Sequence, residues 1–223
     1  MVAVLLLEAQ KQEERRCRSD DRADPRRAAE DQRGDDRGHA IALDGWPLSL
    51  QLANNETGAL QPLAQLAGLA HQQAQTLVHS DATQAAGKIG LDMQQLGVDM
   101  LTLSAHKFNG PQGCGALVVK NRAIQNPLLT GGPQESNRRA GTENVALLVG
   151  MGKAAQLARI NLLEKQAYLL ELRDFFEQRL NSIPGIHIFA AEAERLPNTS
   201  FFAIPYYHGE NLLMQMDQAG FEL

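Results

Sequence analysis

The sequence predicts an α/β fold with a mainly parallel sheet, followed by part of a smaller α+β domain. Runs typical of strands lie at 48–52, 76–79, 100–103 and 116–119, and helically spaced apolar residues separate the first two. Because strands that alternate with helices are usually joined by crossover connections, this order predicts parallel pairing. Two more apolar runs, 186–189 and 200–204, and a helical pattern over 210–218 predict the smaller domain.

Each predicted element has a reason for its limits in the sequence. The run from Leu48 to Leu52 alternates like a strand and stops at the polar turn 54–58. The helical pattern follows Pro62, with its apolar positions at Leu63, Leu66, Ala67, Ala70 and Ala74. The next two strands end in polar residues, Ser80-Asp81 and Ser104-Ala105-His106-Lys107, and the last strand follows the turn Gly113-Cys114-Gly115.

A long helical pattern runs from about Asn144 to Leu180, and Pro184-Gly185 ends it. Such a helix can join a large domain to a smaller one. We therefore expect four regions: an anomalous charged head at 1–46, a partial large domain at 47–143, a connecting long helix at 144–180 and a partial small domain at 181–223.

Composition limits the classes of partner. Of the 223 residues, 43% are hydrophobic and 21% charged, which is ordinary for a soluble globular protein. The net charge of −5 argues against nucleic acid, whose phosphates need a basic face. No run approaches the roughly 20 apolar residues that span a bilayer, and Val2–Leu7 has no signal-peptide features. Two cysteines fit a reducing compartment, so we expect a cytoplasmic protein without membrane or nucleic-acid partners.

The two ends of the chain differ from its middle. From about Glu8 to Gly38 the residues are mostly charged or amide-bearing and include almost no large apolar side chain, so this head cannot offset the entropy of ordering. We interpret it as a disordered head or as sequence foreign to the fold, such as a translated wrong reading frame. At the other end, Phe221-Glu222-Leu223 resembles the start of another strand, which indicates a truncation.

Polar residues gather where three predicted strands end. They are Asn54-Asn55-Glu56, Asp81-Ala82-Thr83-Gln84 and Ser104-Ala105-His106-Lys107. In open α/β sheets, ligands bind at the carboxyl ends of the strands, so these segments predict one pocket.

The residue types in this pocket suit pyridoxal 5'-phosphate (PLP). This cofactor needs a lysine amine for its aldehyde and an acidic partner for its pyridine nitrogen, and Lys107 and Asp81 supply them. Ser104 and His106 flank the lysine closely enough to donate to the phosphate. Taken alone, each is weak evidence, because a lysine is usually a solvated surface charge and an aspartate often caps a helix or turn.

Two amides complete the predicted set. Asn55 and Gln84 can hydrogen-bond the phenolic oxygen of the PLP ring, although either can also be an ordinary turn residue. The combination of these six positions, rather than any single one, favours cofactor binding.

Five motifs, in this order and spacing, resemble those of cysteine desulfurases of the NifS/IscS type, which are class V aminotransferase-family enzymes of PLP fold type I. The resemblance covers about residue 50 to the end. The motifs are Ala53-Asn54-Asn55-Glu56-Thr57-Gly58, His79-Ser80-Asp81-Ala82-Thr83-Gln84, Ser104-Ala105-His106-Lys107, Gly110-Pro111-Gln112-Gly113-Cys114-Gly115 and Arg139-Ala140-Gly141-Thr142-Glu143-Asn144.

The resemblance implies a role for each site residue. Lys107 would bind the cofactor covalently and Asp81 would pair with the pyridine nitrogen. Asn55 and Gln84 would contact the phenolate, while Ser104 and His106 would bind the phosphate. Thr142 resembles the residue that reaches the phosphate of a neighbouring subunit's cofactor, which implies a homodimer.

The same resemblance implies the reaction. L-Cysteine is the substrate, alanine is one product, and a mobile-loop cysteine thiolate carries the sulfur as a persulfide to an acceptor such as an iron–sulfur scaffold protein. No metal is implied.

The sequence departs from the family at both ends. The nucleophilic cysteine would fall beyond the last residue; Cys114 does not match it and is expected to be a packing residue, and Cys17 matches nothing. The phosphate-binding turn and the ring-stacking histidine of the family's amino-terminal half have no counterpart. We therefore expect this chain alone to be unstable and not a competent desulfurase.

Three alternatives remain open. One is another class V enzyme, such as a selenocysteine lyase, which shares the lysine and aspartate. Another is an inactive fragment or a non-catalytic binding protein that retains the family's core. A nucleotide-binding α/β protein is disfavoured, because no phosphate-binding glycine motif follows a strand.

Overall fold

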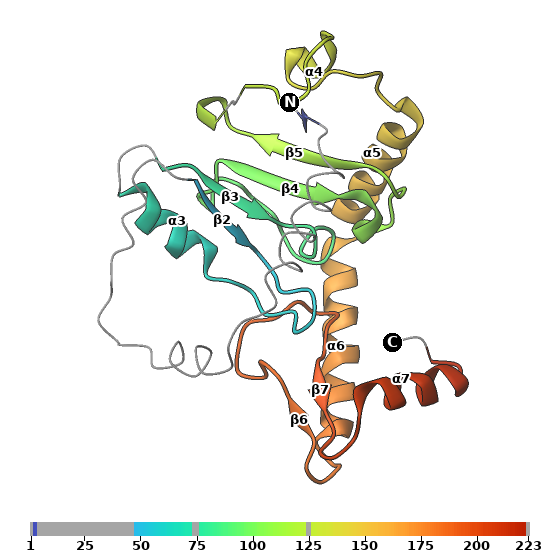
Figure 1. The fold of residues 1–223 in the computed structure, drawn as a ribbon. Helices are drawn as coiled ribbons and strands as arrows, with labels where there is room; N and C mark the ends of the chain where they lie inside the picture. The colour runs from blue at the N-terminus through green and yellow to red at the C-terminus, as the bar shows by residue number, and fades with distance from the viewer. Residues whose placement is uncertain (1, 4–46, 73–75, 124–125, 222–223) are drawn as a thin grey trace, which may run out of the picture.

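The computed structural model describes residues 2–3, 47–72, 76–123 and 126–221 (Figure 1). Within these ranges one five-stranded sheet has the spatial order β1-β5-β4-β3-β2. Strands β2, β3 and β4 pair in parallel, whereas β5 is antiparallel to both β4 and β1, so β5 alone runs in the opposite direction. The predicted mainly parallel α/β sheet is confirmed. The strands are β1 (Val2–Ala3), β2 (Leu48–Gln51), β3 (Val78–Asp81), β4 (Met100–Ser104) and β5 (Gly115–Val119).

The reversed direction of β5 follows from its short connection. Only the 3-10 helix η1 (Ala105–Phe108) and a turn separate β4 from β5. A parallel connection needs a crossover of a dozen or more residues, so this link permits only an antiparallel return.

Helix packing covers one face of the sheet. Helix α3 (Leu63–His71) packs through Leu63, Ala67 and Ala70 into a core that includes Val78 and Leu101. Because side chains alternate along a strand, the neighbours of these strand residues point to the opposite face. Strand register places on that face the side chains of Ser49, His79, Asp81, Met100, Thr102 and Ser104.

Two helices occupy the stretch for which one long helix is predicted. Helix α5 (Val145–Ile160) and helix α6 (Leu162–Leu180) meet at Asn161, whose φ of −97° and ψ of 6° are not helical. The apolar spacing continues across this residue, which is why the pattern alone does not reveal the break. Asn144 begins α5, with its side-chain oxygen accepting a hydrogen bond from the Leu147 amide at 3.2 Å.

Beyond α6 the chain forms a small antiparallel pair, β6 (His187–Ile188) and β7 (Phe202–Ala203), and then α7 (Gly209–Gln218). Both strands and the helix confirm elements predicted from the sequence. Phe202 contacts Phe176 of α6 edge to face, with ring centroids 5.9 Å apart, and thereby ties this pair to the long helix. The remaining short helices are η2 (Asn121–Ala123) and α4 (Gln134–Asn137).

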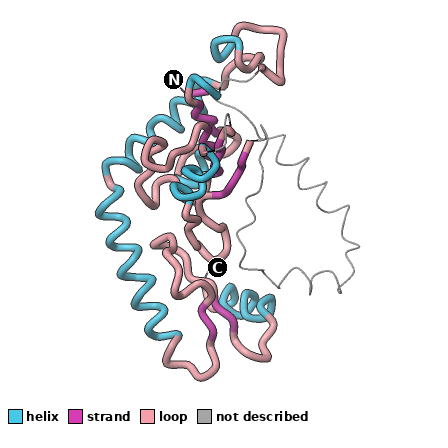
Figure 2. The backbone as a smooth tube through the Cα atoms, turned by 90° about the vertical axis from the view of Figure 1, so that its left-hand side faces the viewer, coloured by secondary structure: helices cyan, strands magenta, loops and turns pink. Residues whose placement is uncertain are grey.

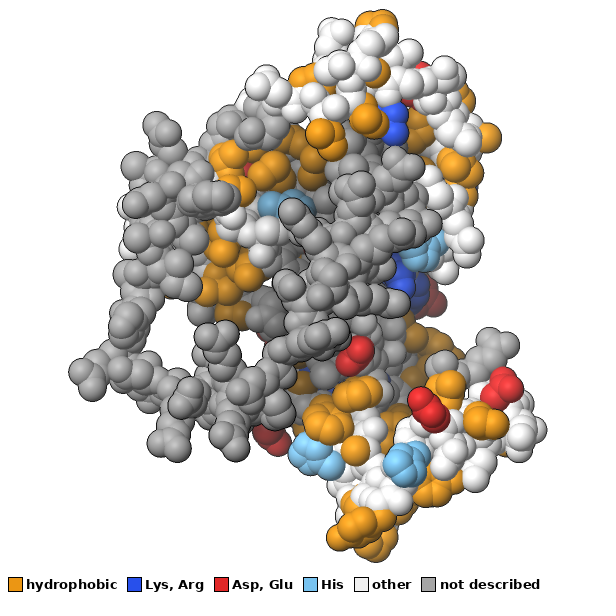
Figure 3. Space-filling model, viewed as in Figure 1, with side chains coloured by type: hydrophobic (Ala, Val, Ile, Leu, Met, Phe, Trp, Pro, Cys, Tyr) orange, Lys and Arg blue, Asp and Glu red, His pale blue; other side chains and the backbone are white. Residues whose placement is uncertain are grey.

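Large apolar side chains lie exposed on the later helices. Figure 3 shows hydrophobic side chains on the surface over the region of β6, β7 and α7. In Figure 2, α5 and α6 form a column to one side of the strands. The exposed set on α5, α6 and α7 includes Val145, Val149, Ile160, Leu163, Phe175, Leu213 and Met214. Exposed apolar side chains of this size are typical of a protein interface where they form a contiguous patch.

Several predictions concern residues that the structure does not describe. Most of the charged head lies outside the described residues, including Cys17, and only Val2–Ala3 is placed, as β1. Phe221 is described and is not in a strand, while 222–223 lie outside the described ranges. The four-region division therefore stays a proposal. Across the described ranges, no helix combines the length and apolar character needed to cross a membrane.

Candidate active site

The carboxyl ends of three parallel strands bring the predicted polar segments to one edge of the sheet. Asp81 is the last residue of β3, and it pairs in register with Gln51 of β2 and Thr102 of β4. Ser104 is the last residue of β4, two positions beyond Thr102 and therefore on the same face. Asn55 follows β2 in the turn. This is the arrangement expected of a ligand site in an open α/β sheet.

The turn after β2 is held by Asn54 rather than by Asn55. The Asn54 side-chain oxygen accepts hydrogen bonds from the amides of Glu56 and Thr57, both at 2.9 Å. Asn55 itself is exposed. Because its neighbour carries the turn, the Asn55 side chain remains available for a ligand.

Lys107 lies in η1, which begins directly after β4. Ala105 and Phe108 are buried, while His106 and Lys107 are exposed between them. The turn closes through Asn109, in the left-handed region at φ 65°, and through the Gly110 amide, which donates to the Ala105 carbonyl at 2.8 Å. The buried side chains of Ala105 and Phe108 thus hold the turn against the core, and the Lys107 side chain between them is exposed.

Ser104 and His106 contact each other beside this lysine. The Ser104 hydroxyl lies 2.9 Å from His106 Nδ1, and which group donates depends on the histidine tautomer. A hydroxyl and an imidazole held together at a strand end are suitable donors for an anion such as phosphate.

The Asp81 carboxylate has a local donor and a histidine neighbour. Its Oδ1 accepts a hydrogen bond from the Thr83 amide at 2.8 Å. His79 lies two residues earlier on the same face, and its Nδ1 is 2.8 Å from the Ser49 hydroxyl. Burial lowers the pKa of His79 against the opposing attraction of Asp81, which keeps the imidazole neutral at physiological pH.

Gln84 has a partner that sequence reasoning missed. Lys88 Nζ donates to Gln84 Oε1 at 3.3 Å. Partial burial lowers the pKa of Lys88, and the positive charges of Lys107 and Lys165 lower it further. Lys88 therefore lies near the predicted cofactor lysine. The four-residue spacing from Gln84 is the signal that could have identified it.

Thr142 lies apart from the strand ends, exposed in the loop between α4 and α5. Across the described ranges no contact joins it to the other predicted site residues, so its role at the cofactor of a neighbouring subunit stays a prediction.

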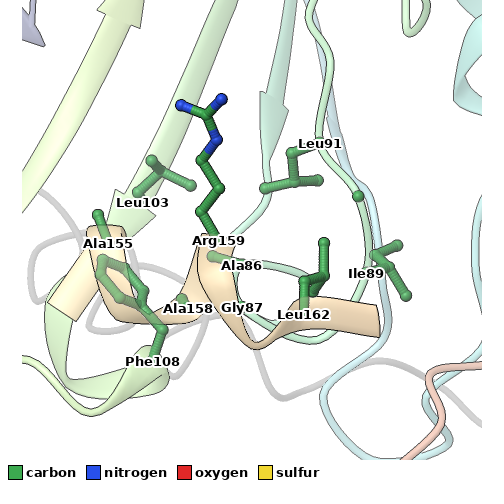
Figure 4. Close-up of a pocket in the computed structure, with 11 residues that line it drawn as sticks. Ala86, Gly87, Ile89, Leu91, Leu103, Phe108, Ala155, Ala158, Arg159 and Leu162 are labelled. Carbon is green, nitrogen blue, oxygen red and sulfur yellow. The ribbon is translucent and has the colours of Figure 1, made fainter. Parts of the chain in front are cut away.

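A cavity of about 460 Å³ lies on the other side of the lysine turn (Figure 4). Its lining is largely apolar and includes Phe108 of η1, Ala155 of α5 and Leu162 of α6. Among the described residues that line it, Arg159 is the only charged one and none is a predicted site residue. The cavity is therefore distinct from the polar strand-end site.

Comparisons with known proteins agree with this geometry. A family model described as aminotransferase class V matches residues 39–223. The chain is 40% identical over 190 residues to the cysteine desulfurase IscS of Dictyoglomus turgidum, covering 85% of this chain and 48% of the relative. It is 44% identical over 174 residues to a cysteine desulfurase of Klebsiella pneumoniae, covering 78% of this chain and 43% of the relative. The chain spans about half the length of the curated relatives it matches.

A solved structure supports the same assignment. The X-ray structure of a NifS-like protein from Rickettsia africae matches with a TM-score of 0.73 and 34% identity, covering 77% of this chain and 48% of that chain. The expected fold type I architecture is thereby confirmed. Together, the family match and the structural similarity show that this chain belongs to the aminotransferase class V family.

Proposed function

We propose that this chain carries the cofactor-binding core of a PLP-dependent cysteine desulfurase. The observation that carries the proposal is the placement of Asp81, Gln84, the Ser104–His106 pair and Lys107 at the carboxyl ends of adjacent strands. The names of the relatives favour desulfurase chemistry over a selenocysteine lyase. The activity, substrate and partners of the whole protein are part of this proposal, because the chain matches about half of each relative.

The donor set fits PLP group by group. Lys107 supplies an exposed primary amine for the aldehyde, and Asp81 supplies a carboxylate for the pyridinium nitrogen. Ser104 and His106 supply donors for the phosphate. The amides of Asn55 and Gln84 supply contacts for the phenolic oxygen. Thr142 of the neighbouring subunit would add a hydroxyl at the phosphate.

PLP, when bound, stores the electrons released from the substrate's α-carbon. Lys107 would have two duties: its amine would hold the cofactor and, when free, would move protons as a general base and acid. Asp81 would keep a proton on the pyridine nitrogen, and the Thr83 amide that donates to Asp81 Oδ1 orients the carboxylate for this contact.

The sulfur-accepting thiol is not Cys114. Its side chain is buried, and its Sγ lies 3.5 Å from the Met151 sulfur. Burial raises the pKa of this thiol, which disfavours the thiolate that attacks sulfur. We propose that the chain by itself binds cofactor but does not complete transfer to an acceptor such as an iron–sulfur scaffold protein.

A homodimer and a cytoplasmic location complete the proposal. The exposed apolar residues of α5 and α6 supply a surface that a second subunit can bury. The low cysteine content supports a reducing compartment.

The test is a spectrophotometric PLP titration of the purified chain. We expect a visible band from lysine-bound PLP that is lost in Lys107→Ala and retained in the exposed-lysine control Lys153→Ala. Asp81→Asn should weaken binding by about tenfold or more, since it removes a charged partner. Sulfide release from L-cysteine is expected to be absent. The absence of this band in the wild-type chain, or a band that persists in Lys107→Ala, would refute the cofactor assignment.

A further inference from the structure

We propose that Lys88 is a positioning residue that fixes the Gln84 amide so that Gln84 offers N–H groups, rather than its oxygen, to the bound cofactor. The inference rests on the proposed function, because it concerns the same PLP site. It assigns a role to a side chain that is not among the seven residues predicted from the sequence.

The chemistry of the pair determines which way the amide faces. A protonated lysine has three donors and no acceptor, so only the amide oxygen of Gln84 can pair with it. The 3.3 Å contact joins Lys88 Nζ to Gln84 Oε1 and leaves the Gln84 Nε2 donors free. The phenolate oxygen of PLP is an acceptor and needs such a donor. With the amide reversed, the Gln84 side-chain oxygen would face the phenolate oxygen of PLP, and neither atom can donate a hydrogen bond.

The fold holds Lys88 at this position. Gly87, at φ 71°, packs so closely on η1 that an added Cβ would lie 2.8 Å from Phe108 Cβ. The Lys88 amide donates to the Ala85 carbonyl at 3.0 Å. The segment that carries Gln84 and Lys88 is therefore fixed against the turn that carries Lys107.

The charge environment agrees with this placement. Lys88 is partly buried, and the pKa of its ammonium is lowered by burial first and then by Lys107 and Lys165. Gln84 is the hydrogen-bond partner that the structure shows for this partly buried ammonium.

The competing explanation is an ordinary surface pair that only supports its own segment. The chain contains a matched control: Lys153 Nζ donates to Gln156 Oε1 at 3.0 Å on the exposed side of α5. This pair has the same chemistry and lies outside the strand-end site. A purely structural role predicts that the two pairs behave alike.

The experiment measures PLP affinity and the bound-cofactor absorbance maximum in the full chain, with the thermal midpoint recorded separately. We expect Lys88→Met to weaken PLP binding about five- to tenfold and to shift the absorbance maximum. Lys88→Arg, which also only donates, should stay within about threefold of the wild type. Lys153→Met should change neither property.

A double-mutant cycle separates positioning from stability. In a Gln84→Ala background, Lys88→Met should cause no further loss of affinity, because the lysine acts through the glutamine. Gln84→Glu keeps a partner for Lys88 but presents an acceptor to the cofactor, so it should bind PLP more weakly than Gln84→Ala while unfolding at no lower temperature.

Two outcomes would overturn the role of Lys88 alone: unchanged affinity in Lys88→Met, or an equal loss in the Gln84→Ala background. Gln84→Glu binding as well as the wild type would instead overturn the donor role of Gln84 on which this inference rests. A wild-type chain without the lysine-bound band would overturn the proposed function and this inference together. The two failures are thus distinguishable.

Discussion

Arg195 and Glu177 form a two-point ion pair that ties the segment after β6 to helix α6. The two Arg195 terminal nitrogens donate to the Glu177 carboxylate oxygens at 2.7 and 2.8 Å. Only 4% of the arginine and 13% of the glutamate side chain is exposed. The same segment bonds to the turn after β2, since the Leu196 amide donates to the Gly58 carbonyl at 2.8 Å. The pair therefore stabilises the segment after β6 in the place where it contacts the turn that follows β2.

Removing one partner of this pair should strongly destabilise the chain. Glu177→Gln leaves the buried Arg195 charge without its counter-ion, which costs about 3–5 kcal/mol in comparable pairs. Urea titration should show a lower midpoint with an unchanged slope. The exposed neighbour Asp174, 60% exposed in its pair with Arg173, is the control, and Asp174→Asn should change the free energy by about 0.5 kcal/mol or less. Equal effects at both sites would contradict this role.

The same pair predicts an acid-sensitive fold. Hydrogen bonds from Arg195 lower the pKa of Glu177 below its ordinary value of 4.5. Because the folded state binds this proton less readily than the unfolded state, the stabilisation is fully present above pH 4.5 and is lost as pH falls through the lower, folded pKa. Urea midpoints from neutral pH down to about pH 3 should fall less steeply for Glu177→Gln than for the wild type. Parallel pH profiles for the wild type and Glu177→Gln would show that another carboxylate dominates the loss of stability in acid.

Gly110 should tolerate no side chain. A Cβ at this position would lie 2.9 Å from both the carbonyl oxygen and the Cβ of Ala105, which anchors the lysine turn. We expect Gly110→Ala to cost about 1–3 kcal/mol and to weaken PLP binding by displacing Lys107. Gly68 of α3 has open space around it, so Gly68→Ala should instead stabilise the chain by about 0.5–1 kcal/mol. Thermal unfolding and PLP titration of both variants check the contrast.

Cys114 should be protected from alkylation in the folded chain. The side chain is 4% exposed and burial raises its pKa, so reaction requires local opening. In a Cys17→Ser background, where Cys114 is the remaining thiol, iodoacetamide should react about 100-fold more slowly than in urea, which corresponds to an opening free energy of about 3 kcal/mol. Mass spectrometry over time measures both rates. Rapid labelling of the native chain would contradict the packing role and make Cys114 a candidate nucleophile.

The strand-end site shows how far a sequence alone can lead. The sequence predicts Asp81, Ser104 and Lys107 as site residues because each comes at the end of a run with strand character, and the alternation of residue types along the chain reveals such runs. The structure places them at strand ends, and their roles stay predictions. The α/β class and most strand and helix positions follow from the same local signal. The break at Asn161 escaped it, because the apolar spacing continues across a residue whose backbone leaves the helix.

The sequence by itself determined the class of fold, the order of the strand-end motifs and the chemical types gathered there. Only the tertiary structure decided which side chains meet: that Lys88 pairs with Gln84, that His106 contacts Ser104 and that Arg195 reaches Glu177. Secondary structure is encoded in neighbouring residues. The pairs Lys88–Gln84 and Ser104–His106 are close in sequence, but they depend on the side-chain directions that the folded turns set, whereas the burial of Cys114 and the partner of Arg195 depend on where distant segments pack. These are the properties from which the chemistry of the site follows.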